Sequence, residues 1–205
     1  MGVSLVTEKD YEHLLNIETQ GTDKYHTSHL YHRYEPTPYE VLNFLFENYT
    51  LNQNDHVVDY GCGKGRLNFY IHHFFQIPVT GIEMNEQFYE VALLNKKNYF
   101  KKHPFAQNDI TFYCGLGETY PIRSNENKFY FFNPFSIQIF RKIIEKILIS
   151  LEECYREVEL ILYYPSDDYQ YFLDQRTPFH LKKEITLPNY HKDHRERFLI
   201  YGLGI

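Results

Sequence analysis

The sequence is poor in cysteine and contains no long hydrophobic run. Its three cysteines, Cys62, Cys114 and Cys154, are odd in number, widely spaced and form no C-x-x-C pair. No disulfide framework or cysteine-based zinc site is therefore expected. No apolar stretch approaches the ~20 residues that a bilayer-spanning helix needs, and the N-terminus lacks the basic and apolar segments of a signal peptide. We expect a soluble, cytoplasmic protein with no membrane partner and no bound metal.

An excess of basic residues is also missing. Lys and Arg number 21 against 27 Asp and Glu, and the formal net charge is −6. This balance argues mildly against broad neutralisation of nucleic-acid phosphates. A small molecule or a protein is therefore the favoured partner. RNA remains an alternative, because a negative net charge is compatible with a local basic patch. At 205 residues, with 20 Tyr and 17 Phe, the chain can build one domain with a substantial aromatic core.

A glycine-rich stretch, Val57–Arg66, organises the rest of the chain. It reads V-V-D-Y-G-C-G-K-G-R, so an apolar run ends at Asp59 and glycines follow at 61, 63 and 65. Apolar residues then recur with helical spacing from Leu67 to Phe75. The pattern predicts a buried strand that turns sharply into a helix, with bare backbone lying close to a nucleotide-like ligand.

The charge beside this loop discriminates between nucleotides. A dinucleotide site has G-x-G-x-x-G, whereas Arg66 occupies the third glycine position here. Asp59 would repel a pyrophosphate but attract a cation, which suits S-adenosylmethionine and disfavours an NAD-type oxidoreductase. Glu83 ends the next apolar run, eighteen residues after Gly65, where a carboxylate can accept both ribose hydroxyls.

An acid-x-G-x-G-x-G stretch followed by a strand-end Glu resembles the class I S-adenosylmethionine-dependent methyltransferases. The resemblance places the glycines along the methionine and ribose, Asp59 near the amino end and Glu83 on the ribose diol. It places Met84 against the adenine. Leu116 and Gly117 occupy a turn where Asp-Ala is common in the family, and this turn could equally be purely structural. The residues assigned to the cofactor in this way are Thr37, Asp59, Tyr60, Gly61, Cys62, Gly63, Gly65, Glu83, Met84, Leu116, Gly117 and Asn133.

Asn133-Pro134-Phe135 partly resembles the [DNS]-P-P-[YFW] loop of methyltransferases that act on nitrogen. There the Asn oxygen and a proline carbonyl accept hydrogen bonds from the target NH₂, and an aromatic ring stacks on it. In this chain Phe135 replaces the second proline and Ser136 the aromatic residue. The candidate catalytic residues are thus Asn133, Pro134 and Phe135. The alternative is that Asn-Pro ends a strand and Ser136 begins a helix.

The order of apolar patterns predicts an α/β fold. Strands at 57–60, 79–83, 110–114, 128–133 and 158–164 alternate with helical patterns, and 180–187 and 197–203 read as a closing antiparallel hairpin. We expect a doubly wound, mostly parallel sheet spanning residues 37–205. Thr37 and Glu40 predict a capping box at the start of its first helix. Arg66 is expected to face solvent or to form a salt bridge.

Residues 1–36 are expected to form an N-terminal extension, either a surface segment or a lid over the cofactor. Thr7–Thr19 can form a helix within it. The predicted function is methyl transfer to an unidentified acceptor, for example a nitrogen of a small molecule or a protein side chain. The alternatives are a non-catalytic S-adenosylmethionine-binding or interaction module and an RNA-directed methyltransferase. The sequence does not indicate the oligomeric state.

Overall fold

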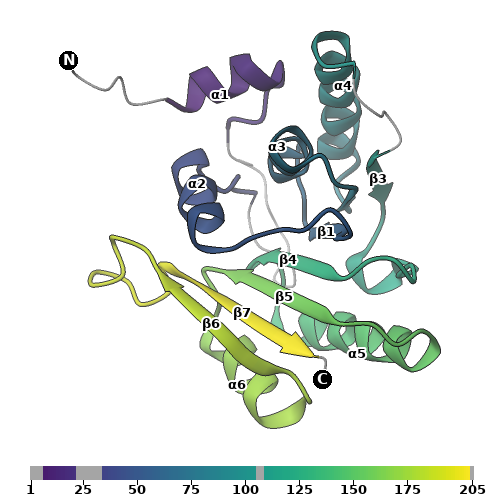
Figure 1. Cartoon of the computed structure of the whole chain (residues 1–205), viewed down its shortest axis with the longest axis vertical. Helices are drawn as coiled ribbons and strands as arrows, with labels where there is room; N and C mark the ends of the chain where they lie inside the picture. The colour runs from purple at the N-terminus through teal and green to yellow at the C-terminus, as the bar shows by residue number, and fades with distance from the viewer. Residues whose placement is uncertain (1–6, 22–33, 105–108, 204–205) are drawn as a thin grey trace.

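The computed structural model describes residues 7–21, 34–104 and 109–203 of the 205-residue chain. Its centre is a seven-stranded sheet with the order β3-β2-β1-β4-β5-β7-β6 (Figure 1). The first five strands pair in parallel, and β7 is antiparallel to both β5 and β6. The strands are β1 (Val57–Tyr60), β2 (Val79–Glu83), β3 (Ile110–Cys114), β4 (Lys128–Phe132), β5 (Val158–Tyr163), β6 (His180–Thr186) and β7 (Arg197–Leu203).

Helices cover both faces of the sheet. One face packs against the first four helices and the other against the last two, as the two hydrophobic clusters and Figure 1 show. The helices are α1 (Glu8–Leu15), α2 (Tyr39–Asn48), α3 (Arg66–Phe75), α4 (Glu86–Lys102), α5 (Ile137–Glu153) and α6 (Asp167–Arg176), with a short 3₁₀ helix, η2 (Gly117–Thr119), before β4. This arrangement confirms the predicted doubly wound sheet with a C-terminal antiparallel hairpin.

Three strands, β4, β5 and β6, end one residue earlier than the sequence pattern predicts, and two of them, β4 and β5, belong to the parallel part of the sheet. Asn133 and Tyr164 have φ angles of 39° and 50°, which lie in the left-handed region and outside extended conformation. The chain therefore turns immediately after Phe132 and Tyr163. Both turns lie at the carboxyl edge of the parallel strands, where ligands bind in sheets of this kind.

The capping box predicted at Thr37 is wrong. Helix α2 begins at Tyr39 with Pro38 as its N-cap, and no side chain caps it. The Thr37 hydroxyl instead forms a hydrogen bond of 2.8 Å with the Tyr130 hydroxyl of β4, so it does not cap α2. The predicted cap Asn85 is confirmed, because its side chain accepts from Gln87 N and Phe88 N.

The N-terminal helix is shorter than predicted. Thr7 and Asp10 form a capping box at its start, and Asn16 ends it with a φ of 55°. The prediction of an extension or lid over 1–36 also covers residues 1–6 and 22–33, which lie outside the described residues.

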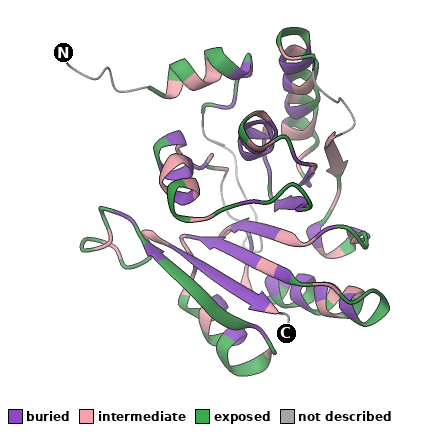
Figure 2. Cartoon of the chain, viewed as in Figure 1, coloured by how far each residue is buried: buried purple, intermediate pink, exposed green. Residues whose placement is uncertain are grey.

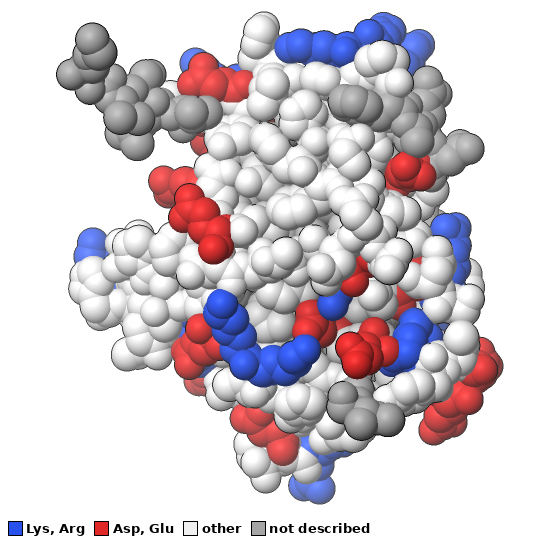
Figure 3. Space-filling view, in the orientation of Figure 1, with Lys and Arg blue, Asp and Glu red and all other residues white. Residues whose placement is uncertain are grey.

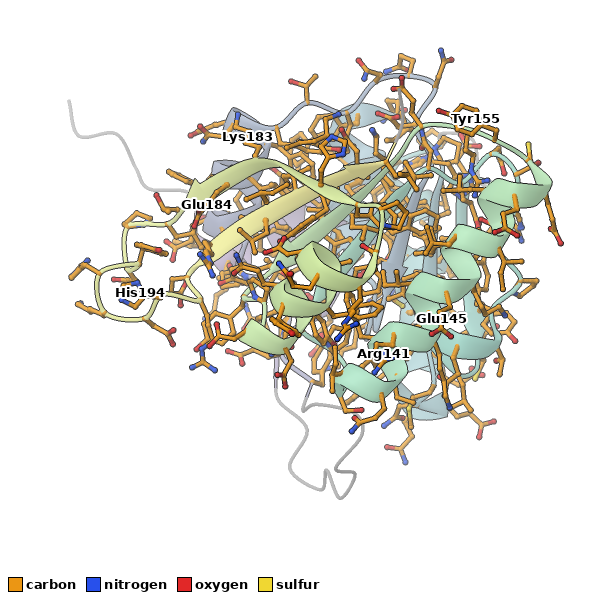
Figure 4. The ribbon with its side chains drawn as sticks, turned by 90° about the horizontal axis from the view of Figure 1, so that it is seen from below. Arg141, Glu145, Tyr155, Lys183, Glu184 and His194 are labelled. Carbon is orange, nitrogen blue, oxygen red and sulfur yellow. The ribbon has the colours of Figure 1, made fainter. Side chains whose placement is uncertain are left out.

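The sheet is buried across its middle and exposed along one edge (Figure 2). Strands β1 and β2 are buried at every residue, whereas β6 exposes six of its seven. Figure 4 shows Lys183 and Glu184 on this edge strand and His194 in the loop beyond it. Charged residues on an edge strand oppose pairing with another chain. Among the described residues, no helix combines the length and apolar character needed to cross a bilayer.

Candidate cofactor and acceptor site

The glycine stretch forms the turn between β1 and α3. Gly63 and Gly65 have φ angles of 55° and 88°, which other residues adopt only with strain. A Cβ on Gly63 would lie 2.0 Å from the Tyr34 ring, and one on Gly65 would lie 2.8 Å from Phe112. Gly65 thus permits α3 to pack on the sheet, and Gly63 permits an aromatic ring to lie directly on the loop.

A cavity opens beside this turn at the carboxyl ends of β1, β2 and β4. Its volume is about 130 Å³, small compared with the roughly 300–1,000 Å³ of typical ligand pockets. Of the residues predicted at the cofactor or acceptor, those in its wall are Thr37, Asp59, Gly61, Cys62, Glu83, Met84, Gly117, Pro134 and Phe135.

The remaining predicted residues lie near the cavity but outside its wall. Gly63 and Gly65 serve the turn and the packing just described, Leu116 is 40% exposed beside the wall residue Gly117, and Asn133 lies in the turn after β4. Tyr60 is 1% exposed and stacks on Phe131 with 4.9 Å between ring centroids. Because successive residues of a strand face opposite sides, Tyr60 enters the core beneath the sheet while Asp59 faces the cavity.

Glu83 is held by backbone amides. Its Oε2 accepts from Gly63 N at 2.9 Å and its Oε1 from Asn85 N at 2.7 Å. Burial raises the pKa of this carboxyl group, and the two backbone hydrogen bonds act in the opposite direction. Each oxygen retains a lone pair for a further donor. Glu83 is thus oriented and can still accept two hydroxyls.

Asp59 is 4% exposed in the wall of the same cavity. Burial, and then the charge of Glu83, raise the pKa of its carboxyl group to about 8. With its amide oriented to satisfy both of its polar atoms, Asn68 donates to Asp59 Oδ2 at 3.2 Å and accepts from Gly81 N. Two desolvated carboxyl groups in one cavity favour a cationic ligand, because a positive charge stabilises their ionised forms.

The segment Tyr34–Thr37 closes one side of the cavity. Thr37 was already assigned to the cofactor, and residues 1–36 were expected to form an extension or a lid, but no motif singled out Tyr34, Glu35 or Pro36. All four residues of the segment lie in the wall. The Tyr34 hydroxyl donates to the Thr19 carbonyl at 2.7 Å, and the Tyr34 ring lies 4.6 Å from that of Phe88. This contact of residues 34–37 with the cavity is what a lid requires, and the role as a lid stays a prediction.

Arg66 also lies in the wall and ties α1 to the glycine turn. It is 4% exposed, which excludes the solvent-facing alternative, and it forms ion pairs with Glu8 at 2.6 Å and Glu12 at 3.3 Å. Its guanidinium further donates to Thr19 Oγ1 at 2.8 Å and to the Thr37 carbonyl at 3.2 Å. The salt-bridge alternative is therefore confirmed.

Phe135 joins the turn after β4 to the core. It is 4% exposed, and its carbonyl accepts from the Tyr169 hydroxyl at 2.5 Å. Before it in the chain, Phe132 and Pro134 lie in the cavity wall. Tyr130 and Phe132 were missed from the sequence, although they share the alternate face of β4 that points to the cavity. Within the described ranges, no group of three or more His, Cys, Asp and Glu side chains could hold a metal ion.

Comparison with known proteins places this site in a recognised type of domain. Residues 51–114 match the family model described as "Methyltransferase domain". A search of curated proteins found no match.

Solved structures share the fold at low sequence identity. The chain is similar to a candidate RNA methyltransferase from Pyrococcus horikoshii, at 17% identity over 95% of this chain and 97% of that chain, with a TM-score of 0.58. It is similar to an RNA methyltransferase from Salinibacter ruber in complex with S-adenosyl-L-homocysteine, at 17% identity over 82% and 92%, with a TM-score of 0.56. It is also similar to the cyclase SpnF, at 12% identity over 81% and 80%, with a TM-score of 0.59.

The cyclase shows that the fold alone does not determine the reaction. Here the family match spans β1 to β3 and includes the glycine turn, Asp59 and Glu83. Residues 51–114 thus match a methyltransferase domain, and the fold of the chain is shared with the solved structures named above.

Proposed function

We propose that the protein transfers a methyl group from S-adenosylmethionine to a nitrogen atom of a small molecule or a protein side chain. The observation that supports this most is the pair Asp59 and Glu83, two buried carboxyl groups that share one cavity with the bare backbone of Gly61. A cavity of this charge prefers a cationic nucleoside to a phosphorylated one.

Each wall residue has a task in this proposal. Glu83 accepts the ribose hydroxyls with its two remaining lone pairs, and Met84 lies against the adenine. Asp59 faces the positively charged methionine end. The bound cofactor supplies a methyl group already activated by its sulfonium, so that the protein has only to align the acceptor and exclude water.

The acceptor side begins at the turn after β4. Asn133 and the Pro134 carbonyl are proposed to accept hydrogen bonds from the acceptor nitrogen. Phe135 is proposed to pack against the acceptor group, in place of the aromatic residue of the resembled loop. The position of Pro134 and Phe135 in the cavity wall supports this assignment. The left-handed φ of Asn133 is backbone strain of the kind found at functional sites.

Isothermal titration with S-adenosylmethionine and S-adenosylhomocysteine tests the cofactor assignment. Glu83→Ala should weaken binding by about 1–3 kcal/mol, because two hydroxyls lose their acceptor. Glu145→Ala, on the exposed face of α5 (Figure 4), is the matched control and should bind like the wild type. Gly63→Arg should abolish binding, because an arginine side chain at position 63 would collide with the Tyr34 ring. Unchanged affinity in Glu83→Ala would remove this residue from the site.

An RNA acceptor is the second candidate, favoured by the names of two structural neighbours. Incubation with radiolabelled methyl donor and fractionated lysate separates the candidates. Label in the metabolite or protein pool supports a nitrogen acceptor of the proposed kind, whereas label in RNA supports the second candidate. Cofactor binding without label in any pool would instead indicate a non-catalytic binding module.

A further inference from the structure

One polar side chain of α3, that of Asn68, is buried among apolar ones. It is 0% exposed, and Leu67, Phe69 and Ile71 of the same helix all belong to the hydrophobic core. An amide buried in such surroundings costs free energy unless it is hydrogen-bonded. A polar residue in a core position therefore calls for a specific partner or a function.

The amide of Asn68 joins two neighbouring strands. Asp59 of β1 and Gly81 of β2 lie opposite each other in the parallel register. With both polar atoms of its amide satisfied, Asn68 donates to Asp59 Oδ2 at 3.2 Å and accepts from Gly81 N at 3.1 Å. The bond from Gly81 fixes the orientation of the amide, because its oxygen is the only acceptor of the side chain. The NH₂ group is thereby directed at the carboxyl group of Asp59.

The partner of Asp59 is uncharged. Among the residues that the structure describes, no Lys or Arg forms an ion pair with Asp59, and Arg66 at the start of α3 is paired with Glu8 and Glu12. On the face seen in Figure 3, basic side chains gather over the C-terminal end of α4, whose last turn carries two lysines. That end is about 25 Å from the start of the helix beside the cavity, since a helix rises about 1.5 Å per residue.

A neutral donor and a cation would have different effects on this site. Both favour the ionised form of a carboxyl group. A cation also cancels the negative charge, whereas an amide leaves that charge in place for a ligand. The hydrogen bond from Asn68 therefore suits a carboxylate whose task is to attract a positively charged ligand.

The other ionisable groups around Asp59 do not favour its ionised form. Glu83 of β2 raises its pKa. The Cys62 thiol of the glycine turn and the Tyr130 hydroxyl of β4 also lie within its electrostatic reach, and burial raises the pKa of both, so both remain neutral. The donor that supports the ionised carboxylate is the amide of Asn68.

We propose that Asn68 is a positioning residue that holds Asp59 ionised and directed at the cavity, and that it thereby sets the preference of the site for positively charged ligands. Asn68 itself lies behind Asp59, outside the wall of the described cavity, so it acts through that carboxylate. This inference rests on the proposed function, because it concerns the cationic end of the S-adenosylmethionine site.

The test compares two ligands that share their adenosine. S-adenosylmethionine carries a sulfonium and an ammonium, whereas 5′-methylthioadenosine carries neither. Each is titrated calorimetrically at pH 7 into the wild type and into Asn68→Ala. We expect Asn68→Ala to weaken S-adenosylmethionine binding roughly ten-fold, the effect of one hydrogen bond to a charged group, and to leave the affinity for methylthioadenosine nearly unchanged. A purely structural role would weaken the binding of both ligands equally.

The pH profile is a second measurement on the same variant. Loss of the amide donor raises the pKa of Asp59, so its proton leaves at higher pH. The pH at which S-adenosylmethionine affinity levels should therefore rise by about one unit. Asn95→Ala is the matched control, because Asn95 is a buried asparagine that bonds only the backbone of Glu18 and Lys64. This control should change neither the ratio of the two affinities nor the pH profile.

A double-mutant cycle shows whether Asn68 acts through Asp59. In an Asp59→Asn background, Asn68→Ala should produce no further change in the ratio of the two affinities, because the group that it positions has lost its charge. An additive change would overturn the inference. Should Asn68→Ala fail to fold, the wild type labelled with ¹⁵N-asparagine provides the test: one side-chain amide resonance should follow the titration of Asp59 and lose that titration in Asp59→Asn. Absence of such a resonance would equally overturn the inference.

The outcomes separate this inference from the proposed function. Wild-type binding of S-adenosylmethionine is measured first, and its failure contradicts the proposed function itself. If the wild type binds the cofactor but Asn68→Ala keeps the ratio of the two affinities and the pH profile, the inference about Asn68 alone is overturned.

Discussion

At the residue scale, we expect Asp59 to couple cofactor binding to pH. Burial and the charge of Glu83 raise the pKa of its carboxyl group to about 8, so at pH 6 the empty site holds it protonated. A cationic cofactor binds the ionised form better, and the proton must leave on binding. We predict that affinity for S-adenosylmethionine rises as the pH increases from 6 to about 8 and then levels. Titrations across this range in buffers of constant ionic strength measure it.

Asp59→Asn provides the control for this pH dependence. Its amide is uncharged at every pH, so the variant should bind more weakly than the wild type above pH 8 and its affinity should be nearly independent of pH. A wild-type affinity that stays level between pH 6 and 8 would mean that Asp59 does not face the cationic end of the ligand.

At the scale of elements, Arg66 is the point where α1, the segment 34–37 and α3 meet. It bonds Glu8 and Glu12 from α1 and the Thr37 carbonyl from that segment. Removing one partner of a buried ion pair leaves uncompensated charge and costs about 3–5 kcal/mol. We predict that Arg66→Ala lowers the free energy of unfolding by an amount at the lower end of this range, because Glu8 is 40% exposed. We also predict that amide hydrogen exchange becomes faster in residues 7–21.

Hydrogen exchange and denaturant unfolding measure the two effects of Arg66→Ala separately. Glu145→Ala, on the exposed face of α5 (Figure 4), serves as control and should change stability by no more than about 0.5 kcal/mol. Exchange that is unchanged in α1 would show that the helix is held by its apolar contacts alone.

The same elements show what sequence patterns can and cannot predict. The turn after β1, Asp59 and Glu83 were predictable because a strand, its glycines and its following helix are local in the chain. The alternation of strand faces could also have assigned Tyr60 to the core. Thr37 was assigned to the cofactor by resemblance, but Tyr34, Glu35 and Pro36 could not be identified individually as cavity wall, because the segment has no periodicity and the Thr37 hydroxyl pairs with Tyr130, 93 residues away.

Long-range pairing accounts for the other differences. The hairpin pattern predicts that β6 and β7 pair, but it does not indicate which of them lies next to β5; the structure places β7 there. Likewise, the sequence around Arg66 does not show whether it faces solvent, since Glu8 and Glu12 lie 58 and 54 residues away. Such choices depend on the packing of the complete fold.

At the scale of the whole molecule, Glu159 links separate parts of the sheet. From β5 it accepts hydrogen bonds from Lys128 of β4 at 2.8 Å, from Lys182 of β6 and from the Tyr49 hydroxyl after α2. Burial raises the pKa of its carboxyl group, but the hydrogen bonds from Lys128, Lys182 and Tyr49 outweigh burial and lower it to about 2. Folding therefore favours the ionised form of Glu159.

This lowered pKa predicts acid sensitivity with a defined window. Above the ordinary glutamate pKa of about 4.3, the ionised Glu159 contributes its full stabilisation, and the contribution is lost as the pH falls toward 2. At about 1.4 kcal/mol per pKa unit, the contribution is about 3 kcal/mol. The measurement is the difference in unfolding free energy between wild type and Glu159→Gln, which should be large at pH 6 and vanish near pH 2.

Asp59, another carboxyl group with a shifted pKa, does not disturb this window, because its pKa is raised and its effect on stability falls between about pH 4 and 8. A difference that stays constant down to pH 2 would mean that Glu159 stabilises the sheet through packing rather than through its charge.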